Sequence, residues 1–382
     1  GNYGGISEMI IRVLIAVVLA VPAYFYTMRY NMHMFQQNGY KNKEHIHWLK
    51  KKFRLQWILY FGLALGIVTC VPYLALEIFE YLVLLVIIVV YRAMKRMNTK
   101  KKLVYTARVK RLLATELILT AAVFALVCGL GGMKRIPGLC LILVSVNLFL
   151  DIVANVINHP MEAGINQHYI NDAVRKLKSV PGLTVIGVTG SYGKTSVKFY
   201  LQTLLQEKYN VLVTPESFNT PMGVVRTIRG SLKPTTEIFV CEMGARHVGD
   251  IKEICDMVHP NHGVITSIGP QHLETFFNME NIQKTKFELA DALPEGGMLF
   301  LNGDNDYIQQ QAASPAYDQT PEKIFYYSET EGTGYCAKDV KVSQLGTEFT
   351  VVTPDGESER FQMRLIGAHN VINVVGAIAV AH

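Results

Sequence analysis

Long apolar runs alternate with basic clusters in the first 158 residues of the chain. The apolar runs cover roughly residues 9–28, 56–71, 72–91, 112–131 and 137–157. A helix needs about 20 apolar residues to cross the hydrocarbon core of a bilayer. The pattern therefore predicts an α-helical transmembrane bundle of about five spans in residues 1–158.

The hydrophobic pattern changes after residue 158. Short buried-strand patterns at 185–188, 211–214, 238–241, 263–266 and 298–301 alternate with helical segments. This alternation predicts an α/β domain with a mostly parallel sheet and helices on both faces. Residues 327–365 favour short strands and turns, which predicts a small antiparallel appendage. We expect a helical linker at 159–180 and the α/β domain at 181–382.

Charge divides the chain in the same way. Residues 1–158 carry 19 basic and 6 acidic side chains, whereas the remainder carries 18 and 25. Because the basic half is also the apolar half, a membrane is favoured as its partner over nucleic acid. The basic residues gather at 29–54 and 92–111, which the positive-inside bias places in the cytosol. We therefore expect an outside N-terminus, a multi-pass plasma-membrane protein and a cytoplasmic α/β domain.

A glycine-rich turn follows the first predicted strand of the α/β domain. Residues 187–196 read GVTGSYGKTS and lead into a helical pattern. In this context backbone N–H groups point at nucleotide phosphates. Lys194 would reach the β- and γ-phosphates, and the Thr195 hydroxyl would bind Mg²⁺. The strict motif has glycine at position 188, where this chain has Val188, so the loop is a variant.

Polar residues also follow other predicted strands. In open α/β sheets, ligands bind beyond the carboxyl ends of the strands, so these residues converge on the loop. Glu242 is then a hard oxygen ligand for Mg²⁺. His272 is a candidate for a second metal or the γ-phosphate, with a purely structural histidine as the alternative. Lys286 lies on a helix predicted at 280–293, and a solvated helix face is the simpler interpretation of that lysine alone.

Seven ordered motifs add a family resemblance. They are TGSYGKTS at 189–196, NTPMG at 219–223, EMGA at 242–245, ITSIGPQHLE at 265–274, ENIQKTKFEL at 280–289, LNGDND at 301–306 and LIGAHNVIN at 365–373. Their order and spacing over residues 181–382 resemble the central ATPase domain of the Mur ligase family. Members of that family are ATP-dependent amide ligases of bacterial peptidoglycan synthesis. Within it, the chain most resembles the ligases that add D-alanyl-D-alanine to a UDP-linked tripeptide.

The resemblance implies site residues and the cofactors ATP and Mg²⁺. The implied catalytic residues are Lys194, His272 and Lys286, the last being a lysine that family members often carry as a carbamate. The implied nucleotide-binding residues are Gly190, Ser191, Gly193, Lys194, Thr195, Ser196, His369, Asn370 and Asn373. The implied metal ligands are Thr195, Glu242, His272 and Lys286. Asn219 and Thr220 match the segment between the γ-phosphate and the acceptor carboxylate.

The resemblance also implies a reaction. An acceptor carboxylate takes the γ-phosphate of ATP as an acyl phosphate, and an amine then displaces phosphate. The amine would be an amino acid or a dipeptide such as D-alanyl-D-alanine. The predicted spans stand where the family has its UDP-sugar domain, so the acceptor would be a UDP-linked or lipid-linked cell-wall precursor. The family's Rossmann-like third domain would follow residue 382, and we expect the given residues alone to be inactive.

Two other functions fit the pattern. One is a membrane-associated ligase for another polymer, of the poly-γ-glutamate type. The other is a transporter or scaffold in which the nucleotide domain is a regulatory switch. The predicted spans lack a central charge or a pair of broken helices, and this argues against transport.

Overall fold

The chain folds as two compact units, residues 1–165 and 166–382, whose boundary falls inside one long helix. The computed structural model describes residues 3–70, 77–94, 102–131, 135–315, 317, 323–329, 334–365 and 367–382. The first unit is helical, and the second is built around a β-sheet.

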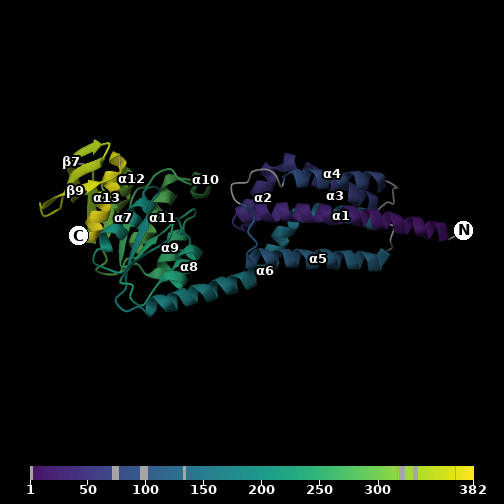
Figure 1. Ribbon diagram of the computed structural model, residues 1–382, viewed down its shortest axis with the longest axis horizontal. Coiled ribbons are helices and arrows are strands. Elements are labelled where there is room, and N and C mark those ends of the chain that lie inside the picture. The colour runs from purple at the N-terminus through teal and green to yellow at the C-terminus, as the bar shows by residue number, and fades with distance from the viewer. Residues whose placement is uncertain are drawn as a thin grey trace. The chain divides into compact units, whose positions relative to one another are not determined.

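The helical unit consists of long helices that lie alongside one another (Figure 1). They are α1 (Tyr3–Gln37), α2 (Asn42–Lys51), α3 (Phe53–Cys70), α4 (Glu77–Met94), α5 (Ala107–Gly131) and the first part of α6 (Ile136–Lys178). Small residues allow close helix packing. A Cβ atom at Gly62 would lie 2.7 Å from Ser145 Oγ, and one at Gly66 would lie 2.9 Å from the Gly138 carbonyl oxygen. Helix α3 therefore packs directly on α6 at these glycines.

The prediction of about five membrane spans is not supported. Among the described residues, two segments are long and apolar enough to cross a bilayer, Ser7–Gln37 in α1 and Ile136–Lys178 in α6. The described apolar part of α3, Gln56–Thr69, is shorter than a span. Helix α4 carries charges at both ends, with Glu77 and Glu80 in its first turn and Arg92 in its last. The start of the predicted span 72–91 lies outside the described residues.

The described strands of the second unit form one nine-stranded sheet, in the order β2-β3-β1-β4-β5-β6-β7-β8-β9. The strands are β1 (Thr184–Thr189), β2 (Val211–Val213), β3 (Ile238–Glu242), β4 (His262–Ile265), β5 (Leu299–Asn302), β6 (Ile324–Ser328), β7 (Tyr335–Ser343), β8 (Gly346–Val352) and β9 (Ser358–Met363). Pairing is parallel from β2 through β7 and antiparallel between β7, β8 and β9.

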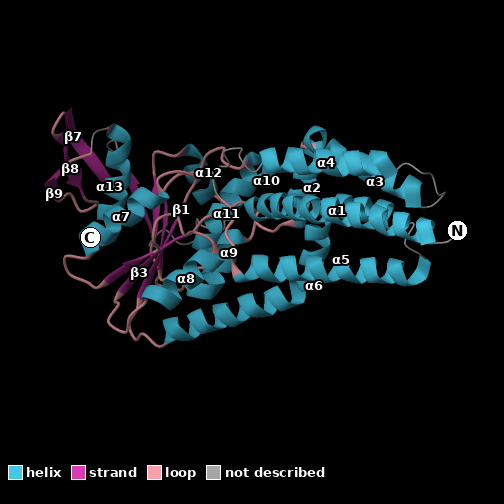
Figure 2. Cartoon of the chain, turned by 45° about the vertical axis from the view of Figure 1, so that its right-hand side comes forward, coloured by secondary structure: helices cyan, strands magenta, loops and turns pink. Residues whose placement is uncertain are grey.

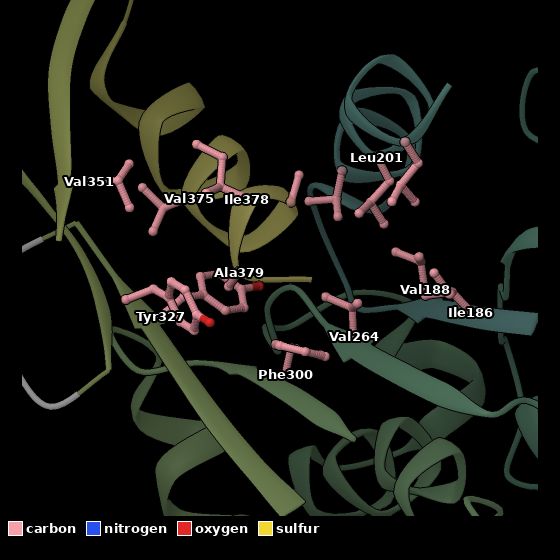
Figure 3. Close-up of a cluster of buried hydrophobic side chains, with 14 of the residues drawn as sticks. Ile186, Val188, Leu201, Val264, Phe300, Tyr327, Val351, Val375, Ile378 and Ala379 are labelled. Carbon is pink, nitrogen blue, oxygen red and sulfur yellow. The ribbon is translucent and has the colours of Figure 1, made fainter. Parts of the chain in front are cut away.

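Helices cover both faces of this sheet (Figure 2). They are α7 (Lys194–Leu205), α8 (Pro221–Ser231), α9 (Asp250–Val258), α10 (Leu273–Phe276), α11 (Met279–Asp291), α12 (Asp306–Ala312) and α13 (Ala368–Ala381). Successive side chains of a strand point to opposite faces. In β1, Ile186 and Val188 therefore pack under α7 and α13 (Figure 3), whereas Val185 packs with α8 and α9.

The five predicted parallel strands are confirmed as β1 to β5, in an α/β fold with a mixed sheet. The antiparallel strands are not a separate appendage. Strand β6 continues the parallel sheet beside β5, and β7 to β9 extend the same sheet further. The predicted linker at 159–180 lies mostly in the last part of α6, which continues through Pro160 to Lys178.

Candidate active site

The glycine-rich turn lies at the point where the strand order of the sheet reverses. Strand β1 lies between β3 and β4, and the turn connects its carboxyl end to the start of α7. Gly190 and Gly193 have positive φ angles of 152° and 83°, which glycine adopts without strain. A Cβ at Gly190 would lie 2.1 Å from Thr266 Oγ1, and one at Gly193 would lie 2.5 Å from Asn373 Oδ1. Both positions therefore require glycine.

The loop after β4 holds this turn in place. The backbone N–H of Ser191 donates to the Ser267 carbonyl at 2.6 Å, and the Ser191 hydroxyl contacts the backbone of Gly269. The backbone N–H of Tyr192 donates to Ser267 Oγ at 2.9 Å. The Ser191 side chain is thus already used to fix the turn, while Ser196 lies in the first turn of α7.

Glu242, at the end of β3, is the centre of a buried hydrogen-bond network. Its carboxylate accepts from Thr195 Oγ1 at 3.0 and 3.1 Å, from Asn219 Nδ2 at 3.0 Å and from Lys198 Nζ at 2.9 Å. Both partners of the Lys198–Glu242 ion pair are fully buried, with 0% and 1% of their side chains exposed. The network joins the carboxyl end of β3 to α7 and to the segment before α8.

Lys198 is the one member of this network that sequence reasoning missed. A signal for it exists, because Lys198 lies on the face of α7 that also carries the buried Val197, Leu201 and Leu205. A lysine on an apolar helix face indicates either an ion pair or a functional group, since an unpaired buried charge is too costly.

Two further lysines carry positive charge at the same edge of the sheet. Lys194 Nζ donates to the carbonyl oxygens of Gly190 and Ser191, at 2.7 and 3.1 Å, and forms no ion pair within the described part of the chain. Burial lowers the pKa of Lys194. Lys286, on α11, is 2% exposed, and burial together with the charge of Lys194 lowers its pKa to about 7. Helix α11 therefore presents Lys286 to the interior, in contrast to a solvated lysine.

His272 belongs to this positive region. It is exposed, has a φ of 56° and precedes the short helix α10. Partial burial and the charges of Arg246, Lys286 and Lys194 lower the pKa of His272. The imidazole is consequently neutral at physiological pH, which is the form that binds metals.

The last motif of the sequence also reaches the glycine-rich turn. Asn373, on α13, lies against Gly193, and Tyr200 on α7 donates to Asn370 Oδ1 at 3.4 Å. The side chain of His369 lies outside the described residues. The predicted nucleotide-binding residues Asn373 and Asn370 thus lie beside the glycine-rich turn and α7.

Asn219 and Thr220 lie in the segment before α8. Besides its bond to Glu242, Asn219 accepts at its backbone carbonyl from the Gly244 N–H at 2.7 Å. Thr220 is the N-cap of α8, and its hydroxyl accepts from the Gly223 N–H at 3.3 Å. Pro221 has no N–H, and the N–H groups of Gly223 and Val224 donate to Thr220, so the Met222 N–H is the one in this turn left for a ligand.

The residues present fit a magnesium–nucleotide complex. Lys286 is buried and Lys194 is half-buried, and neither forms an ion pair in the described ranges, so an anion there would offset their charge. Thr195 and Glu242 supply the hard oxygen atoms that Mg²⁺ prefers. No group of three or more His, Cys, Asp or Glu side chains with metal-binding geometry occurs among the described residues.

Half of the chain matches a known protein family. Residues 188–381 match the model of the Mur ligase middle domain. The UDP-N-acetylmuramoyl-tripeptide–D-alanyl-D-alanine ligase of Bacillus subtilis is 35% identical over 202 residues, which cover 52% of this chain and 41% of the ligase. The ligase of the same name from Escherichia coli is 29% identical over 238 residues, which cover 60% of this chain and 51% of the ligase.

A solved structure gives the same result. The crystal structure of MurF from Acinetobacter baumannii superimposes with a TM-score of 0.52 and 26% identity, over 56% of this chain and 46% of that protein. The chain spans about half the length of the curated relatives it matches. Since the matching family model covers half of the chain and the fold agrees, the chain belongs to the Mur ligase family.

Proposed function

We propose that the chain is the membrane-anchored, ATP-binding part of an amide ligase of bacterial cell-wall precursor synthesis. The observation that carries the proposal is the buried Lys286 and the half-buried Lys194 beside the Thr195–Glu242 pair. Such a site holds the terminal phosphates of ATP and neutralises the charge that develops during phosphoryl transfer.

In the proposed reaction, an acceptor carboxylate attacks the γ-phosphorus of ATP, which gives an acyl phosphate and ADP. An amine then attacks the acyl carbon and expels inorganic phosphate. Lys194 offsets charge on the β- and γ-phosphate oxygens, and the fixed glycine turn aims backbone N–H groups at them. Mg²⁺, held by Thr195 and Glu242, would supply Lewis-acid neutralisation of the phosphate oxygens. Asn219 and the first turn of α8 position the acceptor carboxylate.

Lys286 has the properties of a lysine that becomes a carbamate. Its pKa of about 7 leaves much of the amine neutral at physiological pH, and only the neutral amine reacts with CO₂. The product carries one negative charge and two oxygen atoms. Together with the neutral His272, it would form a second metal site and remove an unpaired buried cation.

The relatives suggest the substrates. Two of them are named as ligases of D-alanyl-D-alanine to a UDP-N-acetylmuramoyl tripeptide. We infer a dipeptide of the D-alanyl-D-alanine type as the amine, and a UDP-linked or lipid-linked muramoyl peptide as the carboxylate acceptor. The acyl phosphate hydrolyses in water, so the site must be dry when the amine attacks.

The helical unit supplies the proposed anchor in the bacterial plasma membrane. Large apolar side chains face outward on several of its helices, with Val18 68%, Ile78 73% and Ile118 68% exposed. Many exposed large apolar side chains on long helices are typical of a membrane interaction. Helices α1 and α6 are long enough to span, and the basic segment that follows α1 would face the cytosol.

The test is a phosphate-release assay on the full-length protein in detergent, with ATP, Mg²⁺, muramoyl-peptide acceptors and D-alanyl-D-alanine. Lys194→Ala should lower acceptor-dependent phosphate release by about 10²–10³-fold, because it removes a cation from the transferring phosphate. Lys208→Ala, on the solvent side after α7, is the matched control and should retain full activity. ATP hydrolysis that ignores every acceptor and amine would contradict the ligase assignment.

A further inference from the structure

The helical unit contains an apolar groove between α1 and α5. It consists of two adjoining hollows that share Phe25 and Leu117. The first hollow, of about 300 Å³, is lined almost wholly by apolar atoms of α1, α5 and α6, from Val17 on α1 to Val144 on α6. The second, of about 440 Å³, lies further along α1, where Arg29 and Tyr105 join the lining. We call these two hollows together the α1–α5 groove.

The groove has the dimensions of one leaflet of a bilayer. On α1 its lining runs from Val17 to Arg29, which at 1.5 Å per residue corresponds to about 18 Å. The hydrocarbon core of a bilayer is about 30 Å thick, so a leaflet accounts for about 15 Å. A single extended lipid chain therefore fits along the groove.

Fixed contacts shape the groove. The side-chain amide of Gln36 accepts from the Val104 N–H at 3.0 Å and donates to the Val104 carbonyl at 2.9 Å, which ties the segment before α5 to α1. The hydroxyl groups of Tyr24 and Thr120 bond to each other at 2.8 Å, so the polar atoms in the wall of the first hollow are satisfied. The first hollow thus presents apolar surface alone.

Arg29 places a positive charge at one end of this apolar surface. Arg12 and Arg111 pair with carboxylates, whereas Arg29 is exposed and forms no ion pair in the described part of the chain. A guanidinium group matches the geometry of phosphate and binds it with paired hydrogen bonds. The positive-inside bias puts this end of α1 at the cytoplasmic surface.

We propose that the α1–α5 groove binds a single-chain lipid phosphate, with its hydrocarbon chain in the first hollow and its phosphate at Arg29. Arg29 lies at the end of an apolar groove as long as one leaflet, and its charge complements a phosphate. This complementarity favours a lipid phosphate over a neutral lipid. One consequence rests on the function proposed above: the carboxylate acceptor of the ligase is carried on a lipid phosphate.

Binding is measured on the full chain in phosphatidylcholine nanodiscs, without ATP, using a fluorescent long-chain prenyl monophosphate as the probe. The prenyl phosphate should bind at least tenfold more tightly than the uncharged prenol of the same chain. Arg29→Gln should abolish that difference and leave prenol binding unchanged. Equal affinity of wild type and Arg29→Gln for the prenyl phosphate would overturn the proposal.

A second set of variants tests the hydrocarbon chain. Ala121→Trp fills the first hollow and should abolish saturable binding of both ligands. Val18→Trp changes an exposed side chain outside the groove lining, and Lys110→Gln removes an exposed charge, so both should bind as wild type. Displacement of the probe by inorganic phosphate alone, or equally well by phosphatidic acid or by a fatty acid, would overturn the single-chain phosphate assignment.

A control separates this proposal from the proposed function. Lys194→Ala should lose ATP binding and keep prenyl phosphate binding unchanged. Conversely, Arg29→Gln should keep ATP affinity and raise only the KM for a lipid-linked acceptor. If the protein binds the lipid phosphate but has no ligase activity, only the proposed ligase function is wrong. If it is a fully active ligase without selective lipid binding, only the assignment of the α1–α5 groove is wrong.

Discussion

At the scale of single residues, we expect Glu242 to have two roles that separate measurements can distinguish. Its carboxylate neutralises the buried Lys198, and in the proposed function it also offers oxygen atoms to Mg²⁺. The first role concerns folding and requires no ligand. The second role is nucleotide binding, and it does not affect the stability of the protein when ATP and Mg²⁺ are absent.

Glu242→Ala should therefore destabilise the protein even without ligands. The substitution leaves the Lys198 ammonium buried and unpaired, which costs about 3–5 kcal/mol in the free energy of unfolding. Denaturant unfolding of the ligand-free protein measures this loss. Lys252→Ala is the matched control, because the Lys252–Asp256 pair is exposed and contributes about 0–1 kcal/mol. If the two variants lose the same free energy of unfolding, the buried Lys198–Glu242 pair contributes no more to stability than the exposed pair.

Lys286 should make stability depend on pH. Its folded-state pKa of about 7 lies below the ordinary lysine value of 10.5, so protonation opposes folding. That penalty is complete below pH 7 and disappears as the pH rises from about 7 to 10. Lys286→Met should thus stabilise the protein at pH 6, by on the order of 4 kcal/mol at about 1.4 kcal/mol per pH unit, and the gain should shrink towards pH 10.

Melting curves from pH 6 to pH 10 in CO₂-free buffer, without ATP, measure this effect. Lys284→Met, on the exposed face of the same helix, is the control and should show no such trend. A gain from Lys286→Met that stays constant across the range would mean that Lys286 titrates like a solvated lysine.

At the scale of elements, α13 is held on the sheet by a close contact. A Cβ at Gly376 would lie 2.8 Å from the ring of Tyr327, a residue of β6 that is 1% exposed. Tyr327 in turn donates from its hydroxyl to the Ile265 carbonyl of β4 at 3.3 Å. The same helix begins with Asn370 and Asn373, next to the glycine turn. The packing of α13 therefore positions part of the proposed nucleotide site.

Gly376→Leu should lower the free energy of unfolding by about 1–3 kcal/mol, since an overpacked core forces α13 away from β6. It should also weaken ATP binding, because Asn373 moves with the helix. Gly230→Ala is the control: that helical glycine has no neighbour within 4 Å, and the change should add up to about 1 kcal/mol of stability. Denaturation and nucleotide titration are the two readouts. If Gly376→Leu destabilises the protein but leaves the ATP affinity unchanged, the packing of α13 does not position the nucleotide site.

Some elements were predictable from the sequence because their signals are local. The buried strands β1 to β5 and the turn at Gly190 and Gly193 follow from apolar runs and from glycine spacing. The continuation of the sheet through β6 was not predictable, because strand pairing between distant segments leaves no local pattern. Helix α6 continues through Pro160, where a proline normally ends a helix. The burial of Lys198 and Lys286 depends on which face of each helix packs on the sheet. Sequence alone does not show this, because a lysine on a helix usually faces solvent.

At the scale of the whole molecule, the helical unit and the sheet unit have different surfaces. The helical unit exposes large apolar side chains such as Leu14, Val18 and Ile118. The sheet unit carries the excess of acidic residues. A lipid environment for the first unit and water for the second accounts for both. The apolar spans were overcounted from sequence because hydropathy alone ignores the terminal charges of α4.

The orientation of α1 follows from the same surfaces and is testable by cysteine labelling. The test uses a Cys128→Ser background, which removes an exposed thiol. Lys43→Cys lies in the basic segment that should face the cytosol. Ser7→Cys lies before the apolar part of α1. An impermeant maleimide added to intact cells should label Ser7→Cys and should leave Lys43→Cys unlabelled until the membrane is permeabilised. Lys208→Cys in the sheet unit should also stay unlabelled in intact cells, because ATP is available in the cytosol. Protection at both positions requires a second crossing besides α6 between residues 43 and 208. Labelling of Lys43→Cys in intact cells would reverse the predicted orientation of α1, and labelling of Lys208→Cys would contradict a cytoplasmic nucleotide site.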